Sequence, residues 1–156
     1  MIANVTTLNN LKENVMNKIY ISWEDLQKDT KELCEKIKAR GEYNKIVAVS
    51  RGGLIPAGIA SYELDLRNVE TINILTYDGE IQRNSSDIEL LENIVNVDEK
   101  TIIIDDLSDT GNTCNILRKI YPKAMFAVVY VKPQGKTSAD IYGKEVEDRW
   151  IVFPWD

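Results

Sequence analysis

A cluster of acidic and small polar residues occupies the stretch DDLSDTGNT, from Asp105 to Thr113. The carboxylates of Asp105, Asp106 and Asp109 fall within five residues, directly after the strand-like run TIII. Like charges this close repel one another unless each faces a hydroxyl, a metal ion or a cation. The small residues that follow, at the expected start of a helix, offer hydroxyls and backbone N–H groups to a phosphate. The stretch therefore predicts a site for a ligand with a phosphate at one end and hydroxyls plus Mg²⁺ at the other, such as a phosphorylated ribose.

A purely structural interpretation competes with this one. Two aspartates at the end of a strand, with Asp109 capping the next helix, are an ordinary acidic turn. For the pair of aspartates alone we favour the acidic turn. The complete stretch from Thr101 to Thr113 favours the ligand site instead.

The composition restricts the chemistry that these residues could perform. The 156-residue chain has no histidine, which excludes Ser-His-Asp and Cys-His catalysis and His-ligated zinc. Acid–base steps then fall to Asp, Glu, Lys or Tyr. The formal net charge of −6 argues against a general nucleic-acid binder, which needs clustered Lys and Arg. An anionic substrate must be held by local positive groups, backbone N–H donors or a metal.

The length predicts a single domain over residues 1–156, with residues 1–18 as an N-terminal extension. No apolar run approaches the roughly 18 residues that a membrane span requires. The N-terminus lacks the basic start and apolar core of a signal peptide, so we expect a cytoplasmic protein. Cys34 and Cys114 are too few and too far apart to suggest a metal cluster or a disulfide framework.

Alternating strands and helices must position the acidic stretch. The hydrophobic patterns predict strands over 18–22, 45–50, 68–77, 100–106 and 124–132, and helices over 23–40, 54–64 and 113–121. Residues 78–99 read as a long polar connection, a type of loop that is often functional or mobile. Residues 133–156 are expected to be mostly irregular, with a short strand near Trp150. The order predicts an α/β fold with a mostly parallel central sheet flanked by helices.

Three notable stretches follow three of the predicted strands. SRGG begins at Ser50, DDLSDTGNT at Asp105 and KPQG at Lys132. Alone, SRGG could be a simple turn and Lys132 a surface lysine. Ligands of parallel α/β sheets collect at the carboxyl ends of the strands. The three stretches together therefore predict one binding site at that edge.

IIIDDLSDTGNT resembles the phosphoribosyl-pyrophosphate (PRPP) motif of type I phosphoribosyltransferases: a hydrophobic strand, two acids, then D-T-G-x-T. Five further segments are similar to segments of the bacterial xanthine-guanine phosphoribosyltransferases: IVAVSRGGLIPAGIASYELDLRNVETI, YISWEDLQ, YDGEIQR, YPKAMFAVVYVKP and DRWIVFPWD. The resemblance covers Tyr20 to Asp156. It implies the type I fold, with a mobile loop and a small C-terminal hood. It also implies purine salvage: transfer of 5-phosphoribosyl from PRPP to N9 of guanine, xanthine or hypoxanthine, with release of pyrophosphate.

The resemblance assigns PRPP and pyrophosphate binding to residues in three places: Ser50, Arg51, Gly52, Arg83, Asp105 and Asp106. It implies a cis peptide between Ser50 and Arg51. The acid pair would hold the ribose hydroxyls and the Mg²⁺ cofactor, with Asp106 as the metal contact. Without its YD…QR context, Arg83 would read as a solvated loop arginine.

The resemblance assigns the 5′-phosphate to the turn before the next helix: Asp109, Thr110, Gly111, Asn112 and Thr113. Asn112 replaces a second glycine that is common in this turn, and Asn tolerates unusual backbone angles. The resemblance makes Asp109 the acid–base residue near purine N7.

The purine base would be bound by three residues. Lys132 would donate to the exocyclic O6, Trp150 would stack on the ring, and the backbone carbonyl of Ile151 would accept from the 2-amino group or a neighbouring N–H. Trp150 could instead be ordinary core packing.

The implied partners are PRPP, a 6-oxopurine base and the nucleotide monophosphate product, with no nucleic acid and no transmembrane segment. We expect a homodimer or a homotetramer. The alternative function is a non-catalytic nucleotide- or PRPP-sensing regulator on the same fold. The net charge of −6 and the presence of Asp109 favour the enzyme.

Overall fold

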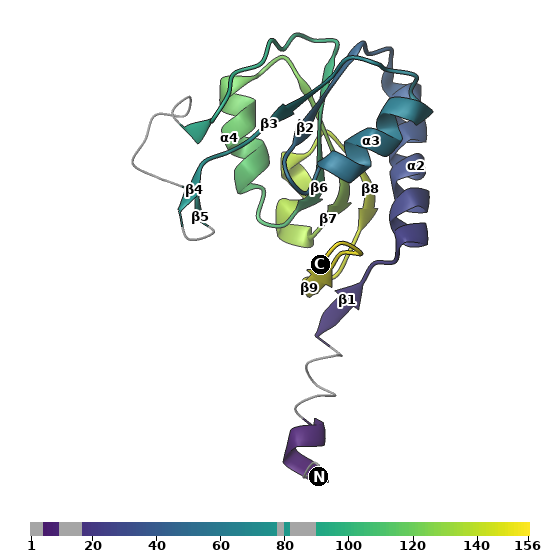
Figure 1. Ribbon diagram of the computed structural model, residues 1–156, viewed down its shortest axis with the longest axis vertical. Helices are drawn as coiled ribbons and strands as arrows, with labels where there is room; N and C mark the ends of the chain where they lie inside the picture. Colours follow the sequence, from purple (N-terminus) through teal and green to yellow (C-terminus); the bar gives the residue numbers. More distant parts are fainter. Residues whose placement is uncertain (1–4, 10–16, 78–79, 82–89) are drawn as a thin grey trace.

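The molecule is built on a five-stranded parallel sheet in the order β3-β2-β6-β7-β8 (Figure 1). The structure is a computed structural model, and it describes residues 5–9, 17–77, 80–81 and 90–156. The strands are β2 (Lys45–Val49), β3 (Val69–Ile72), β6 (Thr101–Ser108), β7 (Met125–Val131) and β8 (Ile141–Glu145). The predicted α/β fold with a mostly parallel central sheet is confirmed.

The central strands are continuous runs of apolar residues because both faces of the sheet are covered. Every residue of β2 and β7 is buried. In β6 the four residues from Thr101 to Ile104 are buried, whereas the following residues, from Asp105 to Leu107, are half-buried. The polar end of β6 therefore emerges from the core at one edge of the sheet.

Three helices cover the two faces of the sheet: α2 (Trp23–Arg40), α3 (Leu54–Glu63) and α4 (Asn112–Ile120). Buried residues of α2 and α3 pack with Ile46 and Ile104 on one face. Buried Leu117 of α4 packs with Val47 and Ile103 on the other. Alternate residues of each strand point to opposite faces, so a single strand supplies both cores.

Helix α2 begins at a capping box formed by Ser22 and Asp25. The Ser22 hydroxyl accepts the N–H of Asp25 at 3.0 Å, and the Asp25 carboxylate accepts the N–H of Ser22 at 3.1 Å. At the other end, the N–H of Gly41 donates to the carbonyl of Ile37 at 3.3 Å. The prediction of a helix over 23–40 is confirmed at both ends.

The C-terminal segment is more regular than predicted. It contains the 3₁₀ helix η2 (Pro133–Ser138), the edge strand β8, and β9 (Trp150–Val152), which pairs in parallel with β1 (Lys18–Tyr20). The expectation of a mostly irregular tail was wrong. Strand β8 is short and contains Gly143, which packs closely against backbone of β7 and α2, and a glycine weakens the hydrophobic pattern of a strand.

The predicted strand over 68–77 is divided into shorter pieces. Strand β3 ends at Ile72, Ile74 forms an isolated bridge with Leu91, and β4 (Thr76–Tyr77) pairs antiparallel with β5 (Glu80–Ile81). The middle of the predicted mobile loop, residues 82–89, lies outside the described residues. Within the described part of the chain, no helix is long and apolar enough to cross a membrane.

Candidate active site at the carboxyl ends of the strands

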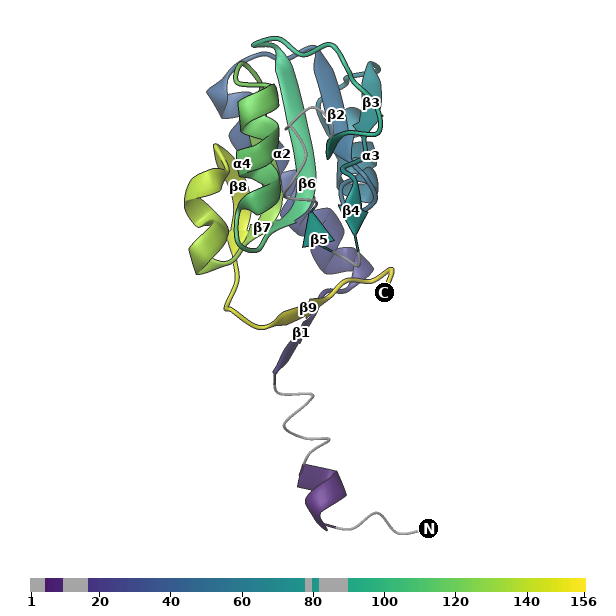
Figure 2. The ribbon, with the colours of Figure 1, turned by 90° about the vertical axis from the view of Figure 1, so that its left-hand side faces the viewer.

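The carboxyl ends of β2, β6 and β7 meet at one edge of the sheet. The strands are parallel and adjacent, so the chain leaves them at the same edge through Ser50, the acidic stretch and Lys132. Figure 2 shows β9 and the C-terminus lying beyond this end of the sheet. The structure thus brings together the three stretches that the sequence places at one edge.

The loop after β2 packs directly on the acid pair. A cis peptide joins Ser50 to Arg51, as the family resemblance implies, and the N–H and hydroxyl of Ser50 bind the carbonyl of Ile72 at 2.9 and 3.2 Å. A Cβ atom at Gly52 would collide with the Asp106 carboxylate. Only glycine leaves room for that carboxylate, so one ligand could contact both the loop and the acid pair.

The acid pair lies inside β6 rather than at its end. The strand continues to Ser108 because Leu107 and Ser108 still pair with Tyr130 and Val131 of β7. The expectation that the aspartates terminate the strand was therefore wrong.

The two acids interact, although neighbouring residues of a strand ordinarily point their side chains to opposite faces of the sheet. The Asp105 carboxylate accepts the backbone N–H of Asp106 at 2.8 Å, and the charge of the Asp106 carboxylate acts on it. The acid pair is therefore a single local cluster of negative charge.

Burial raises the pKa of Asp105 well above its ordinary value, and the negative charge of Asp106 raises it further. Burial likewise raises the pKa of Asp106, with a smaller contribution from the charge of Asp156. A cation bound beside the pair would oppose both shifts. Sequence reasoning missed Asp156, which belongs to the segment DRWIVFPWD but carries no motif of its own.

The donor set at this position fits Mg²⁺. Among the described residues, no group of three or more His, Cys, Asp or Glu side chains is arranged to hold a metal ion. Mg²⁺ does not need such a cage, because it binds through one or two carboxylates, substrate oxygens and water. Asp106, which contacts the loop at Gly52, is placed to supply one of these carboxylate oxygens.

The turn between β6 and α4 forms a small hollow of about 100 Å³, lined by residues 107–114. Gly111 adopts a left-handed conformation with φ 88°, and a Cβ there would collide with the Ser138 hydroxyl. The N-cap residue Gly111 makes no side-chain cap, and the N–H of Asn112 donates only a long hydrogen bond, of 3.4 Å, to the Thr110 hydroxyl. The first turn of α4 can therefore offer backbone N–H groups and this hydroxyl to an anion. Asn112 does not need a positive φ, because Gly111 alone makes the left-handed turn here.

Lys132 is buried, which rules out the surface-lysine interpretation. Its side chain is 8% exposed, and its ammonium group lies 3.2 Å from a carboxylate oxygen of Asp109. The backbone N–H of Lys132 donates to the carbonyl of Ser108 at 3.0 Å. The proposed base-binding lysine and the proposed acid–base residue are therefore direct neighbours.

Trp150 and Ile151 differ sharply in exposure. Trp150 is 68% exposed, so its ring is not part of the core, whereas Ile151 is 6% exposed. The N–H of Trp150 donates to the carbonyl of Asn17, and the carbonyl of Val152 accepts from the N–H of Ile21, the two residues that flank β1. Because backbone groups alternate in direction along a parallel strand, the N–H and C=O of Ile151 point away from β1. They remain available to a ligand on the other side of β9.

The C-terminal hood, formed by β9 and residues 153–156, is joined to the core by aromatic rings. Phe153 stacks on Trp155 with ring centroids 4.7 Å apart and lies 6.0 Å from the ring of Tyr130 in β7. A cavity of about 440 Å³ is lined by Arg51, Gly52, Leu54, Ile55, Trp155 and Asp156. The hood thus faces the loop after β2. Arg83, the remaining predicted site residue, lies outside the described residues.

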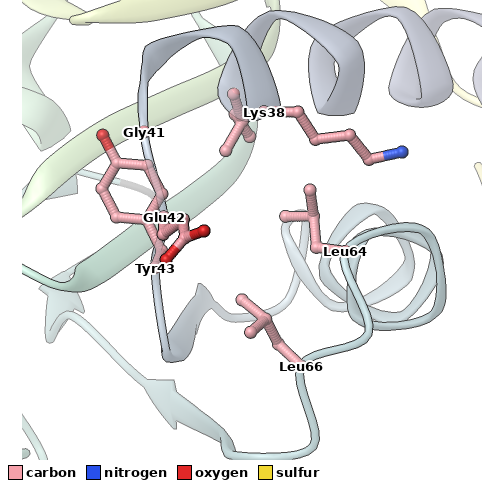
Figure 3. Close-up of a pocket in the computed structure, with 7 residues that line it drawn as sticks. Lys38, Gly41, Glu42, Tyr43, Leu64 and Leu66 are labelled. Carbon is pink, nitrogen blue, oxygen red and sulfur yellow. The ribbon is translucent and has the colours of Figure 1, made fainter.

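A second cavity, of about 390 Å³, lies away from this edge, where α2 and α3 end (Figure 3). Leu64 and Leu66 line it on one side, opposite Lys38, Glu42 and Tyr43. It adjoins the segment that enters the amino end of β2. Ligands of parallel sheets bind at the opposite ends of the strands, so this cavity is not the candidate active site.

Comparisons with known proteins agree with this geometry. Residues 18–156 match the family model described as the phosphoribosyl transferase domain. The chain is 42% identical over 137 residues to the xanthine-guanine phosphoribosyltransferase of Nitratidesulfovibrio vulgaris, covering 87% of this chain and 83% of that protein. It is 41% identical over 140 residues to the enzyme of that name from Idiomarina loihiensis, covering 88% and 86% of the two chains.

Solved structures are similar as well. A purine phosphoribosyltransferase from Pyrococcus horikoshii superposes with a TM-score of 0.72 at 28% identity, over 90% of this chain and 95% of the other. The Helicobacter pylori xanthine-guanine-hypoxanthine phosphoribosyltransferase superposes with a TM-score of 0.69 at 28% identity, over 88% and 93%.

Proposed function

The chain belongs to the phosphoribosyl transferase family, and on that premise we propose that it is a purine salvage enzyme. It transfers the 5-phosphoribosyl group of PRPP to N9 of a 6-oxopurine and releases pyrophosphate. The candidate bases are guanine and xanthine, followed by hypoxanthine. The regulator alternative finds no support, because the similar proteins described above are named as enzymes. The observation that supports the proposal most directly is the packing of Gly52, in the loop after β2, against the Asp106 carboxylate.

PRPP would span the edge of the sheet. Its 5′-phosphate would lie in the turn before α4, held by backbone and hydroxyl groups of Asp109, Thr110, Gly111, Asn112 and Thr113. Its pyrophosphate would be bound by Ser50, Arg51, Gly52 and Arg83, and its ribose hydroxyls by Asp105 and Asp106. Asp106 would also contact Mg²⁺, whose chemical contribution when bound is to neutralise charge on the leaving pyrophosphate.

We call residues 109–113, the turn that leads into α4, the phosphate turn. The base would enter between this turn and the hood. Lys132 would donate to O6, Trp150 would stack on the ring, and the carbonyl of Ile151 would accept from the group at C2 or its neighbour. Asp109 would take or share the purine proton near N7 as N9 attacks C1′. The carboxylates of β6 would then face the positive charge that develops on the ribose. This arrangement needs no histidine.

The proposal extends to the whole protein. Residues 18–156 would form the phosphoribosyltransferase unit, with 1–18 as an N-terminal extension of the same single domain. We propose that the protein works in the cytoplasm as a homodimer or homotetramer and does not bind nucleic acid.

Release of pyrophosphate tests the function directly. The protein is incubated with PRPP and guanine or xanthine, with Mg²⁺ or with excess chelator. We expect pyrophosphate to appear only when base, PRPP and Mg²⁺ are all present. Binding of PRPP without any release of pyrophosphate would support the regulator instead.

A further inference from the structure

Four side chains form a closed ring between the phosphate turn and the hood: Asp109, Lys132, Gln134 and Asp148. The ammonium of Lys132 lies 3.2 Å from Asp109 and 3.7 Å from Asp148. The side-chain nitrogen of Gln134 donates to the same two residues, at 3.1 Å each. Resting on the proposed function, we propose that Gln134 is a positioning residue that holds the Asp109 carboxylate when Lys132 turns to the base.

The chemistry of the ring determines the orientation of the Gln134 amide. Both of its partners are carboxylate oxygens, which accept hydrogen bonds but cannot donate them when ionised. The amide nitrogen has two hydrogens, one for each carboxylate. A flipped amide would place its oxygen against two negative charges. Gln134 therefore joins Asp109 to Asp148 as a neutral double donor.

The two oxygens of Asp109 have different partners. Oδ1 accepts from Gln134, whereas Oδ2 faces Lys132. When Lys132 donates to a 6-oxo group, Oδ2 loses its partner and is exposed to the purine. The hydrogen bond from Gln134 to Oδ1 does not depend on Lys132. It would keep the carboxylate from rotating at the moment when Oδ2 must meet the purine proton.

Hydrogen bonds between the neighbours of Gln134 and the neighbour of Asp109 hold the Gln134 backbone in place. The Ser108 hydroxyl donates to the carbonyl of Gly135 at 2.9 Å, and the N–H of Gly135 donates to the carbonyl of Lys132 at 2.9 Å. A Cβ at Gly135 would collide with the carbonyl of Ser108. The turn that carries Gln134 is thus packed on the strand end that carries Asp109. The anchor Asp148 lies just before the hood strand β9, so the ring also joins the base-stacking region to the phosphate turn.

Kinetics of Gln134 variants test the proposal. Gln134→Ala removes the donor, Gln134→Glu keeps the shape but adds a third carboxylate, and Thr137→Ala, an exposed change on the same 3₁₀ helix, is the control. We expect Gln134→Ala to lower kcat for guanine about tenfold, as for loss of a hydrogen bond to a charged group, with the KM for PRPP within about twofold. Gln134→Glu should lower kcat further, and Thr137→Ala should not change it.

A double variant shows whether Gln134 acts through Asp109. In an Asp109→Asn background, adding Gln134→Ala should change kcat by less than about twofold, because the carboxylate it positions is gone. A full tenfold loss in that background, or an unchanged kcat for Gln134→Ala in the active wild-type enzyme, would overturn this inference alone. A wild-type protein that transfers phosphoribosyl to no 6-oxopurine would overturn the proposed function, and the role of Gln134 with it.

Discussion

At the scale of single residues, the site places two half-buried acids next to each other. The carboxyls of Asp105 and Asp106 lie side by side at the polar end of β6, and burial raises the pKa of both. A group whose pKa is higher in the folded protein holds a proton that the unfolded chain releases. The ligand-free protein therefore loses stability as the pH rises from the ordinary carboxyl value of 3.8 through the raised pKa of this pair.

Asp105→Asn should raise the stability of the ligand-free protein at neutral pH and weaken this pH dependence. It removes one of two mutually repelling, half-buried charges. Each pKa unit by which the folded protein raises a carboxyl corresponds to about 1.4 kcal/mol of stability lost when that carboxyl is ionised. We expect the Tm at pH 7 to rise by about 2–4 °C for each kcal/mol gained. Thermal unfolding at pH 5, 6, 7 and 8 measures the effect, with the exposed Glu99→Gln as control. A lower Tm at pH 7 with an unchanged pH slope would contradict the pKa argument.

Lys132→Ala should separate base binding from PRPP binding. The ammonium group is buried beside Asp109 and is proposed to donate to O6. We expect the KM for guanine to rise about tenfold or more and the KM for PRPP to stay within about twofold. Initial rates at varied guanine and varied PRPP provide both values, and exposed Lys123→Ala is the control. Equal increases in both KM values would count against the O6 contact.

At the scale of elements, the start of α4 depends on one glycine. Gly111 combines φ 88° with a position where a Cβ would meet the Ser138 hydroxyl. Gly58 lies inside α3, where a Cβ would meet no described atom within 4 Å. The two glycines thus form a matched pair for testing the phosphate turn.

Gly111→Ala should destabilise the protein by about 1–2 kcal/mol and raise the KM for PRPP. Gly58→Ala should stabilise it by about 0.5–1 kcal/mol, because alanine is the better helix former, and leave the KM unchanged. Denaturant unfolding and PRPP titration of initial rates measure both effects. A Gly111→Ala protein with wild-type stability and PRPP affinity would show that the turn tolerates a side chain.

The same elements show which features a sequence can predict. The buried strands β2 and β7 and the helix α2 have strong local patterns, so their positions were predicted closely. The end of β6 and the whole of β8 depend on pairing with β7, which no local pattern encodes. The phosphate turn and the acid pair form one contiguous motif. Asp156, by contrast, approaches Asp106 only through the fold, and Gln134 reaches Asp148 across a turn and a strand.

At the scale of the whole molecule, a chain with a net charge of −6 is proposed to bind a highly anionic substrate. It would do so with local groups at one edge of the sheet: the first turn of α4, Arg51 beside the hood, and a cation at the acid pair. The aromatic contacts of Phe153 with Trp155 and Tyr130 fix the hood against the core at this edge. We therefore expect the choice among bases to be made by the contacts of the base with Lys132 on one side and the hood on the other.

The most direct test is a panel of bases with PRPP and Mg²⁺: guanine, xanthine, hypoxanthine, adenine and uracil, each followed separately by nucleotide formation. We predict turnover with 6-oxopurines only, because Lys132 is proposed to donate to an oxygen that adenine lacks and the proposed base site is one for a purine. Turnover of adenine or uracil at rates equal to guanine, or no turnover with any base, would contradict the account.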